Sequence, residues 1–402
     1  MSRHGTSPGF DTDVLVVGAG PTGLALGTAL AREGRRVVVV DKEERTRDTS
    51  RAVVVHARTL EVLDWLGVAA RLVDLGIRVR RFTVRDRDRV LMPIMFDRVP
   101  SAYPYALMVP QHVTEAVLTD RLAASGVEVL RPWELASVTQ DDDGVLARCT
   151  AGRTIRASFV VGCDGMHSTV REEAGIALEG GKYAEEFVLA DIKVSGGVPR
   201  SQAVLYLSPA GLLFVAPLPA GLHRVVGSAS DAPGAIDRDF VQHLLDARGP
   251  RRDRARVERV DRSSRFHIHH RLAARYHQGR LVVAGDAAHV HSPAGGQGMN
   301  VGIVDAAALA AVLDAILDGA PLGLLDEYEA ARRPVARQVI ALTDRLTRLA
   351  VVDPRLRTTR NALIGAAAHV PIIPRRLARR LSGVVYRDTL ATETTPVGGP
   401  VR

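Results

Sequence analysis

Residues 13–42 constrain the fold of this chain more than any other stretch. They read DVLVVGAGPTGLALGTALAREGRRVVVVDK, in which two valine-rich runs flank a glycine-rich turn and an apolar, helix-forming segment. Continuous apolar runs are typical of strands that are buried on both faces of a parallel sheet. The segment therefore predicts a strand–turn–helix–strand unit of an α/β fold with a mainly parallel sheet.

The turn in this unit has the spacing Gly-x-Gly-x-x-Gly. Gly18 permits a tight turn, Gly20 lets the backbone approach a pyrophosphate, and Gly23 lets the helix pack closely on the strand. The helix N-terminus then offers free N–H groups to phosphate, and Asp41 follows the second strand at the spacing of a ribose-binding carboxylate. We predict a dinucleotide site, with a turn used only for packing as the alternative. The predicted site also includes Pro21, Thr22 and Lys42.

Two further strand-to-helix junctions carry a carboxylate or glycines at the turn. Residues 159–175, FVVGCDGMHSTVREEAG, hold an apolar strand that ends near Asp164 and then opens a helix. Residues 281–300, LVVAGDAAHVHSPAGGQGMN, hold a strand, then Asp286, then a glycine-rich loop that enters a helix at about Met299. The carboxyl ends of parallel strands meet at one edge of a sheet. We therefore expect the three turns to converge on one ligand.

The length of 402 residues and the changes in pattern along the chain predict two domains. Residues 181–270 are rich in alternating strands and poor in helices, whereas strands followed by helices dominate on either side. We expect a dinucleotide-binding domain in three segments, 1–75, 111–180 and 271–345. Strands at 76–110 and the sheet at 181–270 would form a substrate domain, and 346–402 would form C-terminal helices and a tail. Residues 57–76 have helical periodicity.

Composition argues against several classes of protein. Aromatic residues make up 4% of the chain, too few for a surface that stacks nucleic-acid bases. Two cysteines outside any paired framework fit a reduced cytoplasmic setting, and no apolar run reaches the roughly 18 residues that cross a bilayer. We expect a cytoplasmic protein with no nucleic-acid or membrane partner. The basic stretches at 251–256 and 374–380 are interpreted as solvated helix faces, and the net charge of +8 would attract anionic cofactors.

In combination and in this order, the three motifs resemble those of one known family. They are the Gly-x-Gly-x-x-Gly turn, Cys-Asp-Gly at 163–165 followed by Ser168 and Arg171, and GDAAHVHSPAGGQGMN at 285–300. Over residues 13–345 the chain resembles the group A flavoprotein monooxygenases, single-component FAD enzymes of the para-hydroxybenzoate hydroxylase fold. The resemblance implies FAD as cofactor, with NAD(P)H and O2 as co-substrates. It also implies hydroxylation of an apolar aromatic molecule through a C4a-hydroperoxyflavin.

The resemblance implies roles for single residues along the phosphates and the sugar chain. The three glycines would lie along the FAD pyrophosphate, and Asp41 would bind the adenosine ribose. Arg51 would contact the phosphates or the flavin, and Gln111 would contact the ribityl region. Asp164 would lie near the pyrophosphate and the path of the pyridine nucleotide, and Asp286 would bind the ribityl chain.

At the flavin ring, the resemblance places Pro293 beside the position where substrate stacks. Backbone N–H groups of Gly298, Met299 and Asn300 would face the pyrimidine edge. Reduced flavin carries negative charge there, and a helix N-terminus stabilises such charge. The flavin carries the chemistry, and the sequence identifies no catalytic side chain.

Several alternatives remain open at this stage. The substrate could be a phenol or a polyketide-like aromatic. Relatives that act on large polyketides carry an extra C-terminal domain, whereas we expect helices after Asp286 here, which leaves smaller aromatics open. The same fold also supports Baeyer–Villiger insertion, epoxidation or drug-inactivating oxidation. A flavin-binding protein without oxygenase activity is a weaker alternative. We expect His289 to be a hydrogen-bond partner at the helix entry and not a metal ligand, and we expect a monomer or homodimer.

Overall fold

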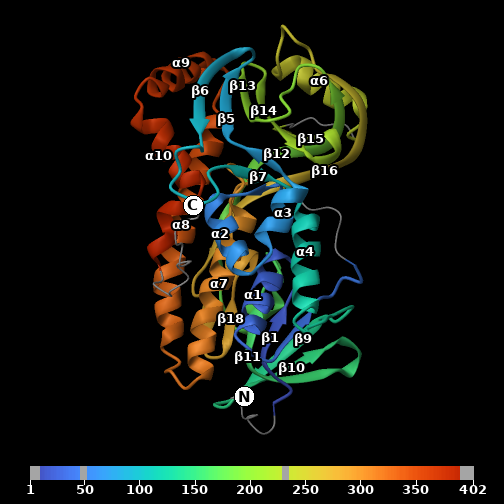
Figure 1. Cartoon of the computed structure of the whole chain (residues 1–402), viewed down its shortest axis with the longest axis vertical. Coiled ribbons are helices and arrows are strands. Elements are labelled where there is room, and N and C mark those ends of the chain that lie inside the picture. Colours follow the sequence, from blue (N-terminus) through green and yellow to red (C-terminus); the bar gives the residue numbers. More distant parts are fainter. Residues whose placement is uncertain (1–9, 46–51, 229–234, 390–402) are drawn as a thin grey trace, which may run out of the picture.

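The computed structural model describes residues 10–45, 52–228 and 235–389. Two eight-stranded sheets lie at opposite ends of the long axis of the molecule (Figure 1). Helices α7 and α8 run along this axis beside the lower sheet, and α9 and α10 lie at the upper edge (Figure 1). This arrangement confirms the predicted α/β class, with a second sheet and C-terminal helices.

The first sheet has the central order β17-β18-β11-β1-β2-β8, and the neighbours from β18 to β8 are parallel. Val14, Leu15 and Val16 of β1 are fully buried, as their continuous apolar run predicts. β9 and β10 extend the sheet as an antiparallel pair beside β11. The strands are β1 Thr12–Val17, β2 Val37–Val40, β8 Val129–Leu130, β9 Leu135–Gln140, β10 Val145–Cys149, β11 Thr154–Gly162, β17 His277–Gln278 and β18 Leu281–Val283.

Four helices accompany this sheet: α1 Pro21–Arg32, α4 Gln111–Ala123, α5 Thr169–Glu173 and α7 Gly298–Leu317. Helix α1 packs against both α4 and α7. In the described part of the chain, α7 alone is long and apolar enough to cross a membrane, with a mean hydropathy of 1.8. Because 61% of that apolar window is buried inside the protein, its composition is accounted for by its place in the core.

The second sheet has the order β19-β16-β12-β15-β14-β13-β5-β6. Its two longest strands, β12 and β16, pair along most of their length, and the end of β16 pairs with β19 next to the glycine-rich loop. This long ribbon therefore links the two halves of the molecule. The strands are β5 Arg81–Asp86, β6 Arg89–Met95, β12 Leu178–Ser195, β13 Ala203–Ser208, β14 Gly211–Leu218, β15 Leu222–Ser228, β16 Arg256–Ala273 and β19 His289–Val290.

Both faces of the second sheet are buried. Side chains such as Val188 and Ile192 join the cluster under α6 (Arg238–Arg248), while their neighbours Phe187 and Leu189 point to the opposite face. On that opposite face a large cluster joins the sheet to the centre of the molecule. We call it the central apolar cluster; its members include Val54, Met108, Phe187, Phe266, Ile364 and Leu381.

A small sheet with the order β3-β7-β4 connects these halves, and α2 and α3 lie between β3 and β4 along the chain. The helical periodicity at 57–76 is confirmed, and the chain forms two helices there, α2 Ala57–Trp65 and α3 Ala69–Leu75. Gly67 separates them with φ +78°, a conformation that glycine adopts without strain and that ends a helix. The strands are β3 Val54–Val55, β4 Ile77–Val79 and β7 Ala106–Met108.

The C-terminal part is helical, as expected. Helix α8 runs from Leu324 to Ala350 without a break, so it continues across the predicted segment end at residue 345. α9 Arg357–Ala368 and α10 Ile372–Leu381 follow, and both pack against β6. Short 3-10 turns are found at Thr150–Gly152, Pro219–Gly221, Gly285–Ala287, Pro354–Leu356 and Val384–Thr389.

A buried polar network fixes α7 to its neighbours. Asp305 in α7 accepts a hydrogen bond from Arg332 of α8 at 2.6 Å and lies 2.7 Å from His289 Nε2 in β19. The side chains of His289 and Asp305 have no exposed surface, and that of Arg332 has 3%. The Arg332 guanidinium and His289 keep the pKa of Asp305 below its usual value despite burial. His289 is thus a hydrogen-bond partner, as expected, but its partner Asp305 is the eighth residue of α7 and does not lie at the helix entry.

Removing the carboxylate charge from this network is expected to be costly. Asp305→Asn should lower the free energy of unfolding by about 3–5 kcal/mol, because Arg332 would remain buried without a counter-charge. Asp326→Asn is the matched control: its carboxylate pairs with His277 but is 80% exposed, so the loss should be below about 1 kcal/mol. Urea unfolding of both variants measures the difference. Equal losses would contradict the role assigned to the buried network.

Candidate functional site

The glycine turn between β1 and α1 has the geometry that its sequence predicts. Gly18 has φ +102°, and a Cβ there would lie 2.4 Å from the carbonyl oxygen of Cys163. A Cβ on Gly23 would lie 1.9 Å from the carbonyl oxygen of Gly18. Around Gly20, in contrast, a Cβ would meet no protein atom within 4 Å. Two glycines are therefore needed for packing, and Gly20 faces open space.

The second motif begins where β11 ends and lies against the glycine turn. Asp164 accepts a hydrogen bond from the Thr169 N–H at 2.8 Å, and Ser168 caps α5 by accepting from Arg171 N–H at 3.0 Å. Burial raises the pKa of Asp164, although hydrogen bonds from Ser168 and the α5 backbone oppose this effect. Burial also raises the pKa of the Cys163 thiol, which keeps it protonated and unreactive.

Two side chains join these turns to the third motif. The buried Arg171 donates to the carbonyl oxygen of Ala287 at 3.1 Å. Thr22, in the first turn of α1, fills the space beside two glycines: a Cβ on Gly285 would lie 2.5 Å from Thr22 Oγ1, and one on Gly302 would lie 2.4 Å from it. The three turns that are distant in sequence therefore meet at the carboxyl edge of the first sheet.

The glycine-rich loop enters α7 at Gly298. Gly298, Met299 and Asn300 form the first turn of the helix, so their N–H groups have no acceptor within it, and no side chain caps this end. The Met299 side chain is buried in the core. The helix thus ends in unpaired donors and the positive end of its dipole.

His56 and Asn300 hold this loop in place, and sequence reasoning missed His56. Asn300 Nδ2 donates to the carbonyl oxygens of Val54 (2.8 Å) and Gly296 (2.6 Å), while its Oδ1 accepts from His56 N–H (2.7 Å). His56 Nε2 lies 2.7 Å from the Gly295 carbonyl oxygen. Burial lowers the pKa of His56 to about 4, so the ring is neutral near pH 7 and Nε2 donates to that carbonyl.

The surroundings of Asp41 were only partly predictable. Its Oδ2 accepts from Ala19 N–H at 2.7 Å inside the glycine turn, and its Oδ1 accepts from Glu43 N–H at 2.8 Å. Arg131, which no sequence motif marks, also lies 2.9 Å from Oδ1. Carboxylate oxygens have several lone pairs, so these contacts orient Asp41 and leave acceptor capacity for a sugar hydroxyl.

Gln111 begins α4 and donates from Nε2 to Glu115 Oε1 at 2.8 Å. Glu115 is buried, which raises its pKa to about 6, and the charges of Arg131 and Asp41 act on it in opposite directions. Gln111 therefore shares one electrostatic neighbourhood with the Asp41–Arg131 pair.

The remaining predicted residues are placed as follows. Lys42, Asp286 and Pro293 are exposed, the last in the loop whose turn closes when Gly296 N–H donates to the Pro293 carbonyl at 2.9 Å. Pro21 is the first residue of α1, where its missing N–H costs nothing. Arg51 lies outside the described residues. Within the described ranges, no group of three or more His, Cys, Asp or Glu side chains could hold a metal ion.

Three features of this edge fit FAD. Open space lies in front of Gly20, where a pyrophosphate would need the backbone. The N-termini of α1 and α7 both lack a side-chain cap, so their N–H groups are available to anionic groups. Asp164 Oδ1 is buried with no hydrogen-bond partner among the described residues. A ligand with donors and with phosphate charge would complete these contacts.

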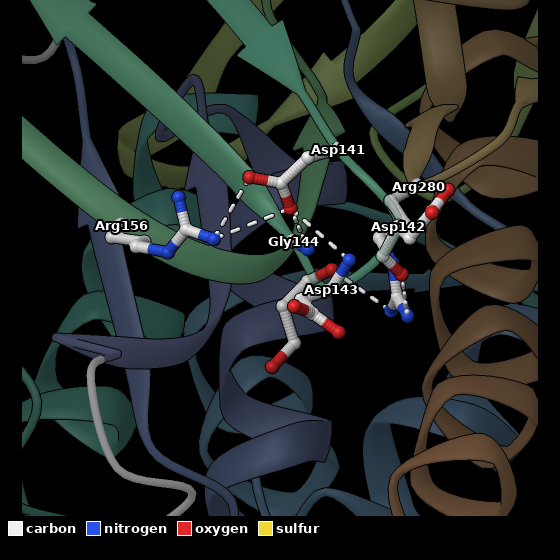
Figure 2. A network of polar contacts seen from close by, with 7 residues as sticks. Asp141, Asp142, Asp143, Gly144, Arg156 and Arg280 are labelled. Atoms are coloured by element: carbon white, nitrogen blue, oxygen red, sulfur yellow. Dashed lines mark hydrogen bonds and ion pairs between the residues drawn. The ribbon is translucent and has the colours of Figure 1, made fainter.

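A pocket of about 570 Å³ at the opposite end of the sheet is separate from this site. It is lined by Arg156 and Ser158 near the start of β11, and by the last residues of α7. Figure 2 shows the neighbouring polar network, in which Arg156 pairs with Asp141 at 2.9 Å and Arg280 donates to the Asp142 carbonyl at 2.9 Å. Ligands of open α/β sheets bind at the carboxyl ends of strands, which makes the other edge the candidate cofactor site.

Comparison with known proteins shows the family to which the chain belongs. A family model described as an FAD binding domain matches residues 11–343. The rifampicin monooxygenase of Streptomyces venezuelae is 36% identical over 93% of this chain and 79% of its own length. The 12-dehydrotetracycline 5-monooxygenase/anhydrotetracycline 6-monooxygenase of Streptomyces rimosus is 35% identical over 96% of this chain and 79% of its own length.

Among solved structures, the p-nitrophenol 4-monooxygenase of Pseudomonas putida superposes with a TM-score of 0.81 at 28% identity. The match covers 92% of this chain and 98% of that one. The fold is therefore shared along nearly the whole of both proteins.

Gly20 offers a direct test of the cofactor site. Gly20→Ala should leave the fold unchanged, because its Cβ meets no protein atom and the backbone φ is −76°. It should weaken FAD binding at least about tenfold, because the methyl group would occupy the space needed for a close backbone–phosphate approach. Gly323→Ala, also free of contacts and with φ −57°, is the matched control and should bind FAD normally. Titration of apoprotein with FAD measures both; unchanged affinity in Gly20→Ala would place the cofactor elsewhere.

The loop contact of His56 predicts a loss of stability in acid. The folded-state pKa of His56, about 4, lies below the ordinary value of 6.5, so between these pH values the unfolded chain binds more protons than the folded one. The free energy of unfolding therefore falls as the pH drops from 6.5 to 4. The contribution of His56 is up to about 3 kcal/mol. His56→Gln, whose amide can donate to Gly295 without titrating, should reduce this slope, whereas the exposed His369→Gln should not. The difference in unfolding temperature between pH 7.5 and pH 5 measures this acid sensitivity. An equal difference in the wild type and both variants would contradict the role assigned to His56.

Proposed function

Because this chain belongs to the family of FAD-dependent aromatic monooxygenases of the para-hydroxybenzoate hydroxylase type, we propose that it oxidises an apolar aromatic small molecule with O2 and NAD(P)H. The observation that carries this proposal is the convergence of the three turns around Gly18, Thr22 and Arg171 at one sheet edge. Each turn contributes backbone donors or a carboxylate, and together they fit a dinucleotide joined to a ring.

We assign the cofactor contacts from this geometry and from the family. Gly18, Gly20 and Gly23, with Pro21 and Thr22, would hold the pyrophosphate at the start of α1. Asp41, with Lys42 beside it, would bind the adenosine ribose in the orientation that Ala19 and Arg131 impose. The remaining contacts would come from Arg51, Gln111, Asp164 and Asp286.

The N-terminus of α7 would meet the ring of the flavin. When bound, FAD takes electrons from the pyridine nucleotide and delivers one oxygen atom of O2 to the substrate. The N–H groups of Gly298, Met299 and Asn300 would stabilise negative charge on the reduced ring. His56 contributes indirectly, because its bonds to Gly295 and Asn300 fix the distance between the loop and β3.

The substrate would lie between the glycine-rich loop and the second sheet. The central apolar cluster spans this region, from Val54 beside the loop to Phe187 and Phe266 of the sheet, whose rings stack with centroids 5.9 Å apart. Pro293, exposed on the loop, would lie beside the reacting carbon. Such a lining favours an aromatic, weakly polar molecule, because a charged substrate would lose its hydration here without a partner.

Relatives leave the size of that molecule open. A p-nitrophenol 4-monooxygenase has the same fold, and a 12-dehydrotetracycline 5-monooxygenase/anhydrotetracycline 6-monooxygenase is 35% identical in sequence. The likeness to a rifampicin monooxygenase also supports a second candidate, the oxidative inactivation of an antibiotic. The same site would serve either reaction, since the cofactor contacts are common to both.

The setting of the enzyme is likewise a proposal. We infer a cytoplasmic enzyme, because Cys149 and Cys163 are both free in the described part of the chain. We further propose that it acts as a monomer or homodimer. We also propose that the domain segments predicted from the sequence have separate roles. The segments around the first sheet would bind FAD, and the second sheet would cover the substrate.

A substrate screen tests the proposed reaction. The purified protein should be yellow, and a matching aromatic compound should raise its oxidation of NADPH or NADH at least about tenfold over the rate without substrate. With isotopically labelled O2, the product should carry one labelled oxygen atom. Small phenols, tetracycline-like and rifamycin-like compounds form the panel, and a non-aromatic lipid is the control.

Two outcomes would contradict this proposal. A protein that takes up no FAD would overturn the cofactor assignment. A protein that holds FAD, is reduced by the nucleotide and yet transfers no labelled oxygen to any aromatic compound would point to the non-oxygenase alternative.

A further inference from the structure

The charge of this protein is concentrated in its C-terminal helices. The segment 354–387 contains eight arginines and no aspartate or glutamate, so its charge equals the +8 of the whole chain. It includes α9 and α10, which lie together at one edge of the molecule (Figure 1). The rest of the chain is therefore close to neutral in sum, and the excess positive charge lies in this segment, with Asp353 and Asp388 directly before and after it.

Most of these arginines are free to meet a partner. Three are engaged: Arg360 is buried against backbone carbonyls, Arg387 pairs with Glu61, and Arg357 donates to the Pro209 carbonyl. The other five are exposed and form no ion pair within the described ranges; they are Arg355, Arg375, Arg376, Arg379 and Arg380.

The same edge exposes large apolar side chains. Six of the eleven exposed large apolar residues in the described part of the chain fall within this segment. They are Leu356, Leu363, Val370, Ile372, Ile373 and Val385, between 39% and 66% exposed. We call the five free arginines and these six side chains the basic–apolar face. Single exposed apolar residues are common, but a group of them among unpaired arginines indicates a binding surface.

The inner side of the same helices is firmly anchored. Ile364, Ala378 and Leu381 are buried in the central apolar cluster. Gln297 of the glycine-rich loop donates to the Leu381 carbonyl at 2.9 Å, and Leu381 packs against Gly295. The inner side of these helices is therefore packed into the core, and the exposed apolar side chains lie outside it.

We propose that the basic–apolar face docks on the surface of an anionic lipid bilayer. A helix that places arginines and apolar side chains together on its outer side suits the interface between lipid headgroups and acyl chains. Arginines are drawn to anionic headgroups, and Ile372 and Leu363 can enter the layer beneath. A second copy of the chain is a poorer occupant, because pairing this face with itself would bring ten unneutralised arginines together.

This surface attachment needs no membrane-spanning helix. The sequence predicts no membrane partner, and α7, which is long and apolar enough to cross a bilayer, is mostly buried inside the protein. A peripheral contact requires only an amphipathic edge. The proposal is independent of the reaction proposed above. It places the apolar cluster one helix away from the lipid, the phase in which weakly polar aromatic molecules concentrate.

Sedimentation with vesicles tests the proposal on the FAD-loaded full chain. The protein should sediment with phosphatidylcholine vesicles containing phosphatidylserine, but not with phosphatidylcholine alone, and binding should weaken as salt rises. Arg375→Gln with Arg376→Gln should lower the partition coefficient at least about tenfold. Leu363→Ser with Ile372→Ser should lower it as well, since these exposed side chains add apolar contact with lipid.

A matched control separates this face from general basicity. Arg252→Gln with Arg254→Gln removes the same charge from another exposed stretch that lacks neighbouring exposed apolar residues, and should leave vesicle binding within about twofold. FAD content checks that each variant is folded. No sedimentation with anionic vesicles, or equal loss in the control pair, would overturn the proposal. So would sedimentation velocity showing an oligomer in the native protein that the Leu363 and Ile372 changes dissociate, since the face would then join copies of this chain.

Discussion

The site depends on one steric constraint, the approach of three backbone turns to van der Waals contact at the carboxyl edge of the first sheet. No Cβ fits between Gly18 and the Cys163 carbonyl, or between Gly285 and Thr22. Glycine at these positions lets the turns close without the strain that a side chain would impose. The edge is consequently lined by backbone donors, which suits a ligand that is flat and carries two phosphates.

Rigidity at this edge comes from polar contacts as much as from packing. Arg171 bridges the second and third turns, Asn300 and His56 bind the loop to β3, and the buried Asp305–Arg332 pair fixes α7 behind them. Each of these groups is buried, so leaving it unpaired would be costly. The N-terminus of α7 is thereby held at a fixed distance from the glycine turn, as electrostatic stabilisation of a reduced ring requires.

The two faces of the C-terminal helices show how one element can serve both the core and the surface. Leu381 packs on the loop and closes the central apolar cluster, while the exposed Ile372 and the arginines beside it face outward. The excess charge is thus carried on the outward side of helices whose inner side contacts the glycine-rich loop.

The sequence by itself determined the fold class, the cofactor type and the three turns, because their spacing of glycines and carboxylates is a local property. It also identified Asp41, Asp164 and Asn300, which belong to those motifs. Only the tertiary structure revealed Arg131 beside Asp41, His56 beneath Gly295, and the break at Gly67. Arg131 and His56 contact residues far away along the chain, and a local sequence pattern does not show which distant residues the fold brings together.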